Sequence, residues 1–351
     1  MQYVVMHSTR ARLSCVAGAG GLHHDTGMDT GKNRGSQMTI AYVFPGQGAQ
    51  AIGMGKALAD SYPTARAVFD EVDDVLGQNL SALIWEGDIE TLTLTQNAQP
   101  ALMATSLAAM RALEAEGVTV ADAGCVAGHS LGEYSALAAA GAISLGDTAL
   151  LLRTRGLAMQ SAVPVGVGAM AAVLGLDLAA VAEIAAQAAG DEVCEAANDN
   201  DPAQVVVSGH LAAVERAVEL AKAKGAKRAL MLPVSAPFHC ALMEPAAREM
   251  EHALSEVVIN APLVPLIANV RAGAVTDPDE IRALLVKQVT GRVRWRESVV
   301  AMGAMGVTEM WEIGAGKALS GMIRRIDRAI ACRAVGTPED AVAAAEHLKQ
   351  G

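Results

Sequence analysis

The segment that most constrains this chain is a serine between two glycines, Gly128-His129-Ser130-Leu131-Gly132. The apolar residues 124–127 before it predict the end of a buried strand, and the alanine-rich residues 131–140 after it predict a helix. Glycine on both sides permits a sharp strand-turn-helix elbow, because neither residue carries a Cβ that would clash. The elbow would expose the Ser130 hydroxyl at a helix N-terminus, where free amides and the helix dipole favour negative charge. Ser130 is therefore a candidate nucleophile, and a plain tight turn is the alternative.

Composition narrows the class of protein. With 52% hydrophobic and 19% charged residues, 351 residues can bury a large core in one or two domains. Aromatic residues make up only 3%, which suits helices packed tightly on a parallel sheet. The net charge of -11 argues against nucleic acid as a partner. No apolar run reaches the roughly 20 residues that span a bilayer. The chain is therefore predicted to be soluble, without a membrane partner.

The cysteines bear on compartment and metal binding. Their number, five, is odd, and none are spaced as C-x-x-C. This pattern favours neither a disulfide framework nor a zinc site. We expect a cytoplasmic protein with no metal.

Periodicity predicts an α/β protein with a hydrolase-like core, a mainly parallel sheet and an inserted small domain. Within the insertion, strands and helices alternate as βαββαβ, the order of a ferredoxin-like unit. The expected parts are a disordered leader at 1–38, a discontinuous large domain at 39–166 and 234–338, the small domain at 167–233, and a C-terminal tail at 339–351. For the leader, the alternatives are an expression remnant, a start placed before the true Met38, and a targeting segment.

The first predicted strand, 40–44, runs into the glycine-rich loop 45–50. The loop lacks the Lys-Ser or Lys-Thr of a phosphate-binding loop and is not G-x-G-x-x-G. Gln47 lies between two glycines, where its amide can approach a reacting group. A solvated turn is the alternative.

Two basic side chains are further candidates. Ser144 and Asp147 predict the start of a helix that carries Arg153 and Arg155. These arginines cannot share a face, since two helical positions differ by about 200°. One of them can therefore point inward and grip a carboxylate, although an exposed surface pair is the alternative. His239, in a Pro-Phe-His-Cys segment, is a candidate base for a serine, or else a structural histidine.

Two polar groups of residues remain open to more than one interpretation. Residues 198–202, Asn-Asp-Asn-Asp-Pro, predict a loop between the middle strands of the small domain, which either faces a cleft or is simply a turn. A set of basic residues gathers in the last third of this acidic chain and is either a docking surface for an acidic partner or a solvated face. Its members are Arg292, Arg294, Arg296, Lys317, Arg324 and Arg325.

Several of these motifs together resemble the malonyl-CoA:acyl carrier protein transacylase family, in the family's order from Met38 to about Val335. They are the segments 44–50, 128–134, 154–160 and 237–240, together with Gln288. Ala315 stands where the family usually has proline, and Phe238 matches members that serve polyketide assembly.

The resemblance implies an acyltransferase that works in two steps. Ser130, deprotonated by His239, would take the malonyl group from malonyl-CoA and pass it to the phosphopantetheine thiol of acyl carrier protein. Arg155 would bind the malonyl carboxylate, and the backbone carbonyl of Gln288 would orient the histidine.

The resemblance also implies an oxyanion hole formed by the amides of Gln47 and Leu131. No cofactor is implied, and the absence of coiled-coil heptads favours a monomer. The pathway would be fatty acid or polyketide synthesis. A serine hydrolase with the same elbow and a non-catalytic carrier-binding module are the competing hypotheses.

Overall fold

The computed structural model describes residues 39–234 and 236–350. Its larger sheet has the strand order β10-β9-β1-β2-β7-β8. Neighbouring strands run parallel, except that β8 is antiparallel to β7. The strands are β1 (Ile40–Phe44), β2 (Ala123–Gly128), β7 (Leu266–Ala268), β8 (Gly273–Val275), β9 (Glu309–Ile313) and β10 (Ala331–Val335). The predicted mainly parallel core is confirmed.

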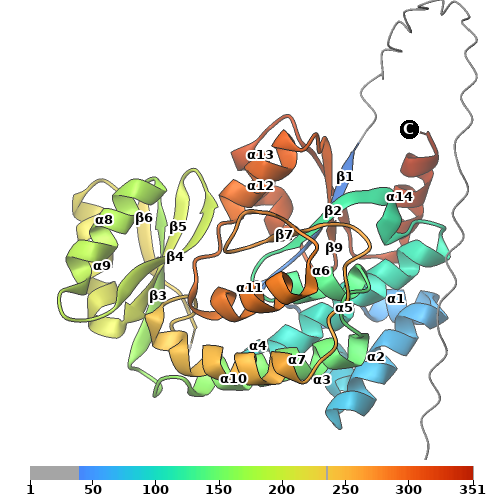
Figure 1. Ribbon diagram of the computed structural model, residues 1–351, viewed down its shortest axis with the longest axis horizontal. Helices are drawn as coiled ribbons and strands as arrows, with labels where there is room; N and C mark the ends of the chain where they lie inside the picture. Colours follow the sequence, from blue (N-terminus) through green and yellow to red (C-terminus); the bar gives the residue numbers. More distant parts are fainter. Residues whose placement is uncertain (1–38, 235, 351) are drawn as a thin grey trace, which may run out of the picture. The chain divides into compact units, whose positions relative to one another are not determined.

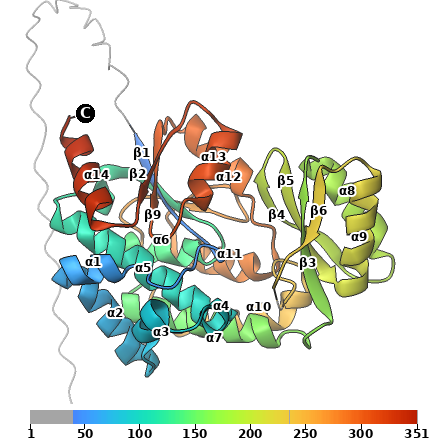
Figure 2. The ribbon, with the colours of Figure 1, turned by 180° about the vertical axis from the view of Figure 1, so that it is seen from behind.

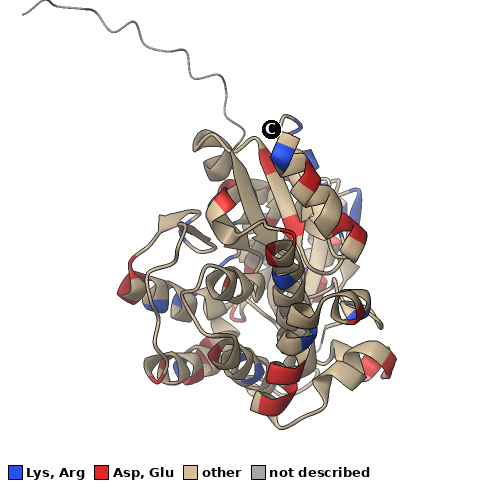
Figure 3. Cartoon of the chain, turned by 90° about the vertical axis from the view of Figure 1, so that its right-hand side faces the viewer, with Lys and Arg blue, Asp and Glu red and all other residues tan. Residues whose placement is uncertain are grey.

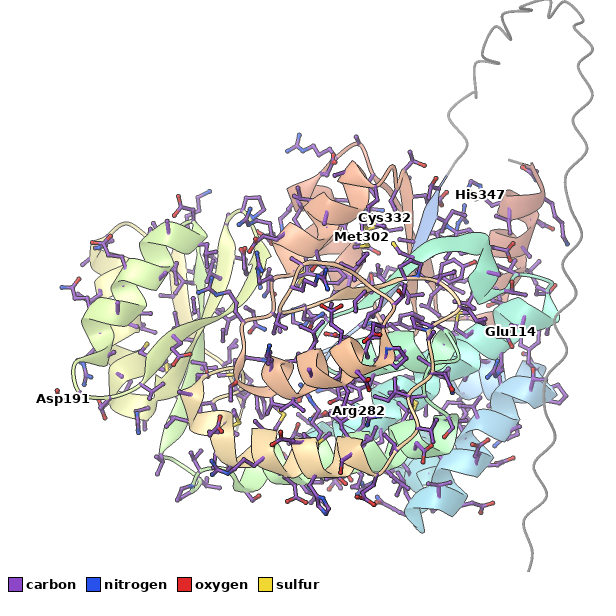
Figure 4. The ribbon with its side chains drawn as sticks, in the orientation of Figure 1. Glu114, Asp191, Arg282, Met302, Cys332 and His347 are labelled. Carbon is purple, nitrogen blue, oxygen red and sulfur yellow. The ribbon has the colours of Figure 1, made fainter. Side chains whose placement is uncertain are left out.

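Side chains of β1 alternate between two cores, one on each face of the larger sheet. Tyr42 and Phe44 belong to one core, and Ala41 and Val43 to the other. Helices α12 (Trp295–Ala304) and α13 (Ala318–Ile326) cover the second face (Figure 1). Met302 and Cys332 lie close together there (Figure 4). The first core is closed by α1 (Lys56–Ser61), α2 (Pro63–Leu76), α3 (Leu80–Glu86), α4 (Ile89–Thr93), α5 (Thr95–Ala115), α6 (Gly132–Ala139), α7 (Leu145–Ser161), α10 (Glu244–Ser255), α11 (Pro278–Thr290) and α14 (Pro338–Gln350).

A second, antiparallel sheet has the order β4-β5-β3-β6. It consists of β3 (Gly168–Leu174), β4 (Cys194–Asp201), β5 (Gln204–His210) and β6 (Arg228–Met231), with α8 (Leu178–Ala189) and α9 (Leu211–Ala223). These helices pack on the sheet face that points away from the larger sheet (Figure 2). The element order and strand order are those of a ferredoxin-like unit, so the predicted inserted small domain is confirmed.

The sequence predicts a loop at residues 198–202, and this prediction is wrong, because β4 continues to Asp201. Asn and Asp have a low intrinsic preference for β-strands. Here the carboxylates of Asp199 and Asp201 are buried and form ion pairs with Arg296 (2.9 Å) and Arg325 (2.7 Å). Their partners lie on α12 and α13, so contacts between the two sheets' layers override the local preference.

Helix α5 begins at Thr95 and carries Pro100 in its interior. The C-terminal segment differs from the sequence-based expectation. The expected tail, 339–351, lies largely in α14, whose Ala341 and Ala344 are buried in the first core. The expected leader, 1–38, lies outside the described residues. None of the described helices is long and apolar enough to cross a membrane.

Candidate active site

Ser130 lies in the turn between β2, which ends at Gly128, and α6, which begins at Gly132. Its φ of 54° is left-handed, a conformation that costs a residue with a side chain about 1–3 kcal/mol. A Cβ on Gly128 would lie 1.9 Å from backbone atoms of Gly132, and one on Gly132 would lie 2.2 Å from the oxygen of Phe44. Neither position tolerates a side chain. The predicted strand-turn-helix elbow is therefore confirmed.

His239 lies between the small domain and α10, also with a left-handed φ, 61°. Its Nε2 is 2.8 Å from Ser130 Oγ, and its Nδ1 is 2.9 Å and 3.1 Å from the carbonyl oxygens of Gln288 and Gly291. Because carbonyls only accept hydrogen bonds, Nδ1 carries the proton and Nε2 presents its lone pair to the hydroxyl. Burial and the nearby charge of Arg155 lower the pKa of His239 to about 3. The imidazole is therefore neutral at neutral pH.

Arg155 on α7 is the arginine that points inward, and only 1% of it is exposed. Its Nη1 donates to Gln99 Oε1 (2.7 Å), and its Nη2 donates to Gln288 Oε1 (2.8 Å) and Ser130 Oγ (3.0 Å). Within the described part of the chain, its Nε has no hydrogen-bond partner and no carboxylate forms an ion pair with it. A buried guanidinium without a counter-ion suits an anionic ligand group. Arg153 does not line the cavity that Ser130 and Arg155 share.

The two amides expected at an oxyanion hole lie beside Ser130. The loop that carries Gln47 follows β1, and Leu131 follows Ser130, so both extend from the carboxyl ends of neighbouring parallel strands. Gln47 and Leu131 line one cavity with Ser130. Neither N–H group donates a hydrogen bond to any described residue. The Gln47 side chain is held separately, because its Oε1 accepts from Thr95 Oγ1 at 3.0 Å.

The cavity, about 400 Å³, lies between the two sheets' layers, and the small domain contributes part of its lining. Asn198 and Asn200 of β4 face it, as does Phe238 beside His239. The Oδ1 of Asn200 is 2.9 Å from Nε2 of His129, which links β4 to the elbow. The polar residues of β4 thus do reach the cleft, although from a strand.

Sequence reasoning missed four polar residues that hold the site together. Gln99 and Thr95 lie on the first turns of α5, where nothing in the spacing marks them. Asn269, after β7, accepts a hydrogen bond from the Ser130 amide through its Oδ1 (2.8 Å). Glu133 lies under the elbow and accepts from Gln288 Nε2 (2.8 Å). Only Glu133 had a signal, since it belongs to the serine motif.

Charged residues of both signs are mixed over the helices (Figure 3). Of the basic residues in the last third, four side chains bind within the protein. Arg292 donates to the oxygen of Ala196, Arg294 pairs with Glu297, and Arg296 and Arg325 pair with β4. Lys317 and Arg324 are exposed on or beside α13. Four of the six side chains therefore have partners within the protein, and a docking surface for an acidic partner stays a prediction.

The described cysteines are free, and among the described residues no group of three or more His, Cys, Asp or Glu side chains could hold a metal. Cys240, next to the histidine, donates to the oxygen of Pro237 (3.2 Å), and burial raises the pKa of its thiol to about 11.

Comparison with known proteins identifies the family. Residues 41–314 match the model of the acyl transferase domain. The malonyl CoA-acyl carrier protein transacylase of Bacillus subtilis (strain 168) is 46% identical over 312 residues, which cover 89% of this chain and 98% of that protein. The chain belongs to the malonyl-CoA:acyl carrier protein transacylase family. The transacylase of Escherichia coli (strain K12) is also 46% identical, over 88% of this chain and 99% of that protein.

Solved transacylase structures share the fold over the same span. The acyl-carrier-protein-S-malonyltransferase from Bartonella henselae is 56% identical with a TM-score of 0.87, over 89% of this chain and all of that one. A malonyl-transacylase in complex with a type II PKS acyl-carrier protein is 41% identical with a TM-score of 0.86, over 88% of this chain and 99% of that one. The chain is thus an acyltransferase of this family along nearly the whole length of its relatives.

Proposed function

We propose that this protein transfers the malonyl group of malonyl-CoA to the phosphopantetheine thiol of acyl carrier protein, through a malonyl ester on Ser130. The observation that carries the proposal is the position of the Ser130 hydroxyl, which lies 2.8 Å from a neutral histidine nitrogen and 3.0 Å from a buried guanidinium. The first neighbour activates a nucleophile. The second offers a site for a carboxylate next to the reacting carbon, which malonyl has and acetyl lacks.

In the first step, Ser130 Oγ bonds to the thioester carbon of malonyl-CoA while its proton moves to Nε2 of His239. The carbon–sulfur bond then breaks, and the proton leaves with the CoA thiol. In the second step, the carrier's thiol gives its proton to Nε2 and its sulfur bonds to the carbon. The serine oxygen leaves and takes the proton back, so no cofactor is needed.

The tetrahedral intermediate of each step carries a negative oxygen. The free N–H groups of Gln47 and Leu131 are the donors for it in this proposal. A donor of this kind typically contributes a factor of about 10² to 10³ in rate. The backbone carbonyl of Gln288 holds His239 in the required tautomer, a task that an acidic residue performs in many serine enzymes.

The acceptor and the setting follow from the same chemistry. The family names and the relative solved with an acyl-carrier protein support a carrier-bound thiol as the acceptor. The product would supply extender units for fatty acid or polyketide synthesis in the cytoplasm. A single chain supplies every group of the site, which supports a monomer. Nucleic acid and membranes have no part in the proposal.

Intact-protein mass spectrometry tests the function. After brief mixing with malonyl-CoA, we expect a malonyl adduct that maps to Ser130 and moves to added holo acyl carrier protein. Acetyl-CoA should give much less adduct. An adduct lost to water without reaching the carrier would support a hydrolase instead, and the absence of any adduct would support a non-catalytic binding module.

The protonation state of His239 gives a second prediction. An imidazole with a pKa near 6.5 would be mostly charged at pH 5 and would fail as a base. Because burial and Arg155 lower the pKa of His239 to about 3, we expect its ring to stay neutral at pH 5, with the proton on Nδ1. Nitrogen-15 NMR of labelled protein, assigned with a His239→Gln variant, measures this directly. A titration midpoint near pH 6.5 would contradict the prediction.

A further inference from the structure

We propose that Glu133 is a positioning residue for malonyl selectivity, because it fixes the orientation of the Gln288 side-chain amide and thereby of the Arg155 guanidinium. The inference rests on the function proposed above, in which Arg155 binds the malonyl carboxylate. None of the motifs assigns Glu133 a task. It lies one helical turn after the serine, on the buried side of α6.

The contacts of Glu133 converge on one oxygen. Its Oε2 accepts from Gln288 Nε2 (2.8 Å) and from the backbone N–H of Asn269 (3.1 Å). All three residues are at most 1% exposed. A buried carboxylate is costly unless it is well paired, so these two donors stabilise Glu133 in this position.

The amide of Gln288 has two chemically different ends, and its partners require one orientation. Its Oε1 accepts from Arg155 Nη2 (2.8 Å), while its Nε2 donates to the carbonyl oxygen of Ser130 (2.9 Å) and to Glu133. A reversed amide would place an N–H donor against the guanidinium and an oxygen against two acceptors. The acceptors of Nε2 are a backbone carbonyl and the Glu133 side chain, and the second can be removed by substitution. Glu133 therefore helps to hold the amide in the orientation that presents Oε1 to Arg155.

Charge supports the same arrangement. Arg155 has no carboxylate in direct contact within the described residues. Glu133 is a buried acid that reaches it through one intervening amide. Burial raises the pKa of Glu133 to about 7, whereas the hydrogen bonds from Gln288 and Asn269 and the charge of Arg155 act to lower it. The acid thus lies near the guanidinium without contacting it, which leaves the guanidinium edge free for a ligand.

Glu133 is also connected to the elbow, through Asn269. These contacts form a second arm of the hydrogen-bond network, beside the one through Gln288. The Asn269 amide that it binds belongs to a residue whose side chain accepts from the Ser130 N–H (2.8 Å) and donates to the Gly128 oxygen (2.6 Å). Disturbing this arm would slow every acyl donor alike. The ratio of malonyl to acetyl transfer therefore reports only on the contacts that connect Glu133 to Arg155 through Gln288.

The test compares kcat/KM for malonyl-CoA and acetyl-CoA in variants of the full chain. Glu133→Leu removes both hydrogen bonds, and leaving a buried donor without its acceptor is worth a factor of about 10 to 100. We expect the malonyl-to-acetyl ratio to fall by that factor. Glu133→Gln keeps an oxygen for both donors, so its ratio should stay within about threefold of the native one. Ser135→Ala is the matched control, because this buried hydroxyl on the same helix has no partner among the described residues.

If Glu133→Leu does not fold, Glu133→Asp replaces it, since withdrawing the carboxylate by one methylene should lower the ratio as well. A double variant, Glu133→Leu with Gln288→Leu, should show no further loss beyond Gln288→Leu alone. An unchanged ratio in Glu133→Leu or Glu133→Asp would overturn this inference. Absence of malonyl preference in the native protein would instead overturn the proposed function, so the two failures are distinguishable.

Discussion

Replacing Ser130 with alanine is expected to abolish malonyl-enzyme formation and to lower transfer to acyl carrier protein by at least about 10⁴-fold, as removal of a nucleophile does in serine enzymes. The fold should persist, because serine and alanine share the left-handed backbone strain at this position. The loss is large because, among the described residues, the Ser130 hydroxyl is the group placed to form an ester with His239 as its base.

No neighbouring side chain can replace the hydroxyl. Cys240 follows the histidine in the chain, but its Sγ donates a hydrogen bond to the carbonyl oxygen of Pro237. Burial also raises the pKa of its thiol to about 11. At neutral pH it is a protonated thiol, not a nucleophile. Residual transfer through a cysteine is therefore not expected.

Intact mass spectrometry and carrier-loading assays measure the effect of Ser130→Ala. Ser135→Ala, which changes a serine of the following helix α6 outside the cavity, should retain the native rate. Thermal unfolding of both variants shows whether the fold is intact. A malonyl adduct on Ser130→Ala protein would refute the nucleophile assignment.

Much of the fold follows from local patterns. The apolar run 40–44 gives β1, and the alanine-rich residues 131–140 give α6. The local hydrophobic pattern of each of these segments matches the environment that the segment has in the fold. The elbow is predictable for a similar reason, since its two glycines report close backbone contacts that any side chain would block.

Prediction fails where a segment depends on partners far along the chain. Asp199 and Asp201 look like turn residues, and only Arg296 and Arg325 of α12 and α13 allow them to form a buried strand. The sequence likewise does not reveal that these two arginines have partners within the protein.

In the candidate site, some residues could be predicted from local motifs, whereas others could be found only in the structure. Motifs locate Ser130, His239 and Arg155, since each sits in a distinctive local segment. Gln99 and Asn269 reach the site through hydrogen bonds to residues far along the chain, Arg155 and Ser130. No local spacing encodes such contacts, so only the structure reveals them.

Arg155→Ala is expected to lower kcat/KM for malonyl-CoA by about 10² to 10³, because the bond between a buried guanidinium and a carboxylate is worth several kcal/mol. Acetyl-CoA has no carboxylate to lose, so its kcat/KM should change little, and malonyl preference should collapse. The guanidinium also holds Gln99 and Gln288, whose Oε1 atoms would be left without this donor. Thermal unfolding therefore accompanies the kinetic measurement.

The matched control is Arg153→Ala on the same helix. Arg153 carries the same charge but does not line the cavity, so its loss should leave the malonyl-to-acetyl ratio within about threefold. Arg155→Lys separates charge from shape, because lysine keeps the charge but lacks the planar fork that meets a carboxylate with two parallel bonds. We expect it to recover part of the preference. An Arg155→Ala protein that still strongly favours malonyl-CoA would show that another group recognises the carboxylate, and the selectivity argued for Glu133 would lose its basis with it.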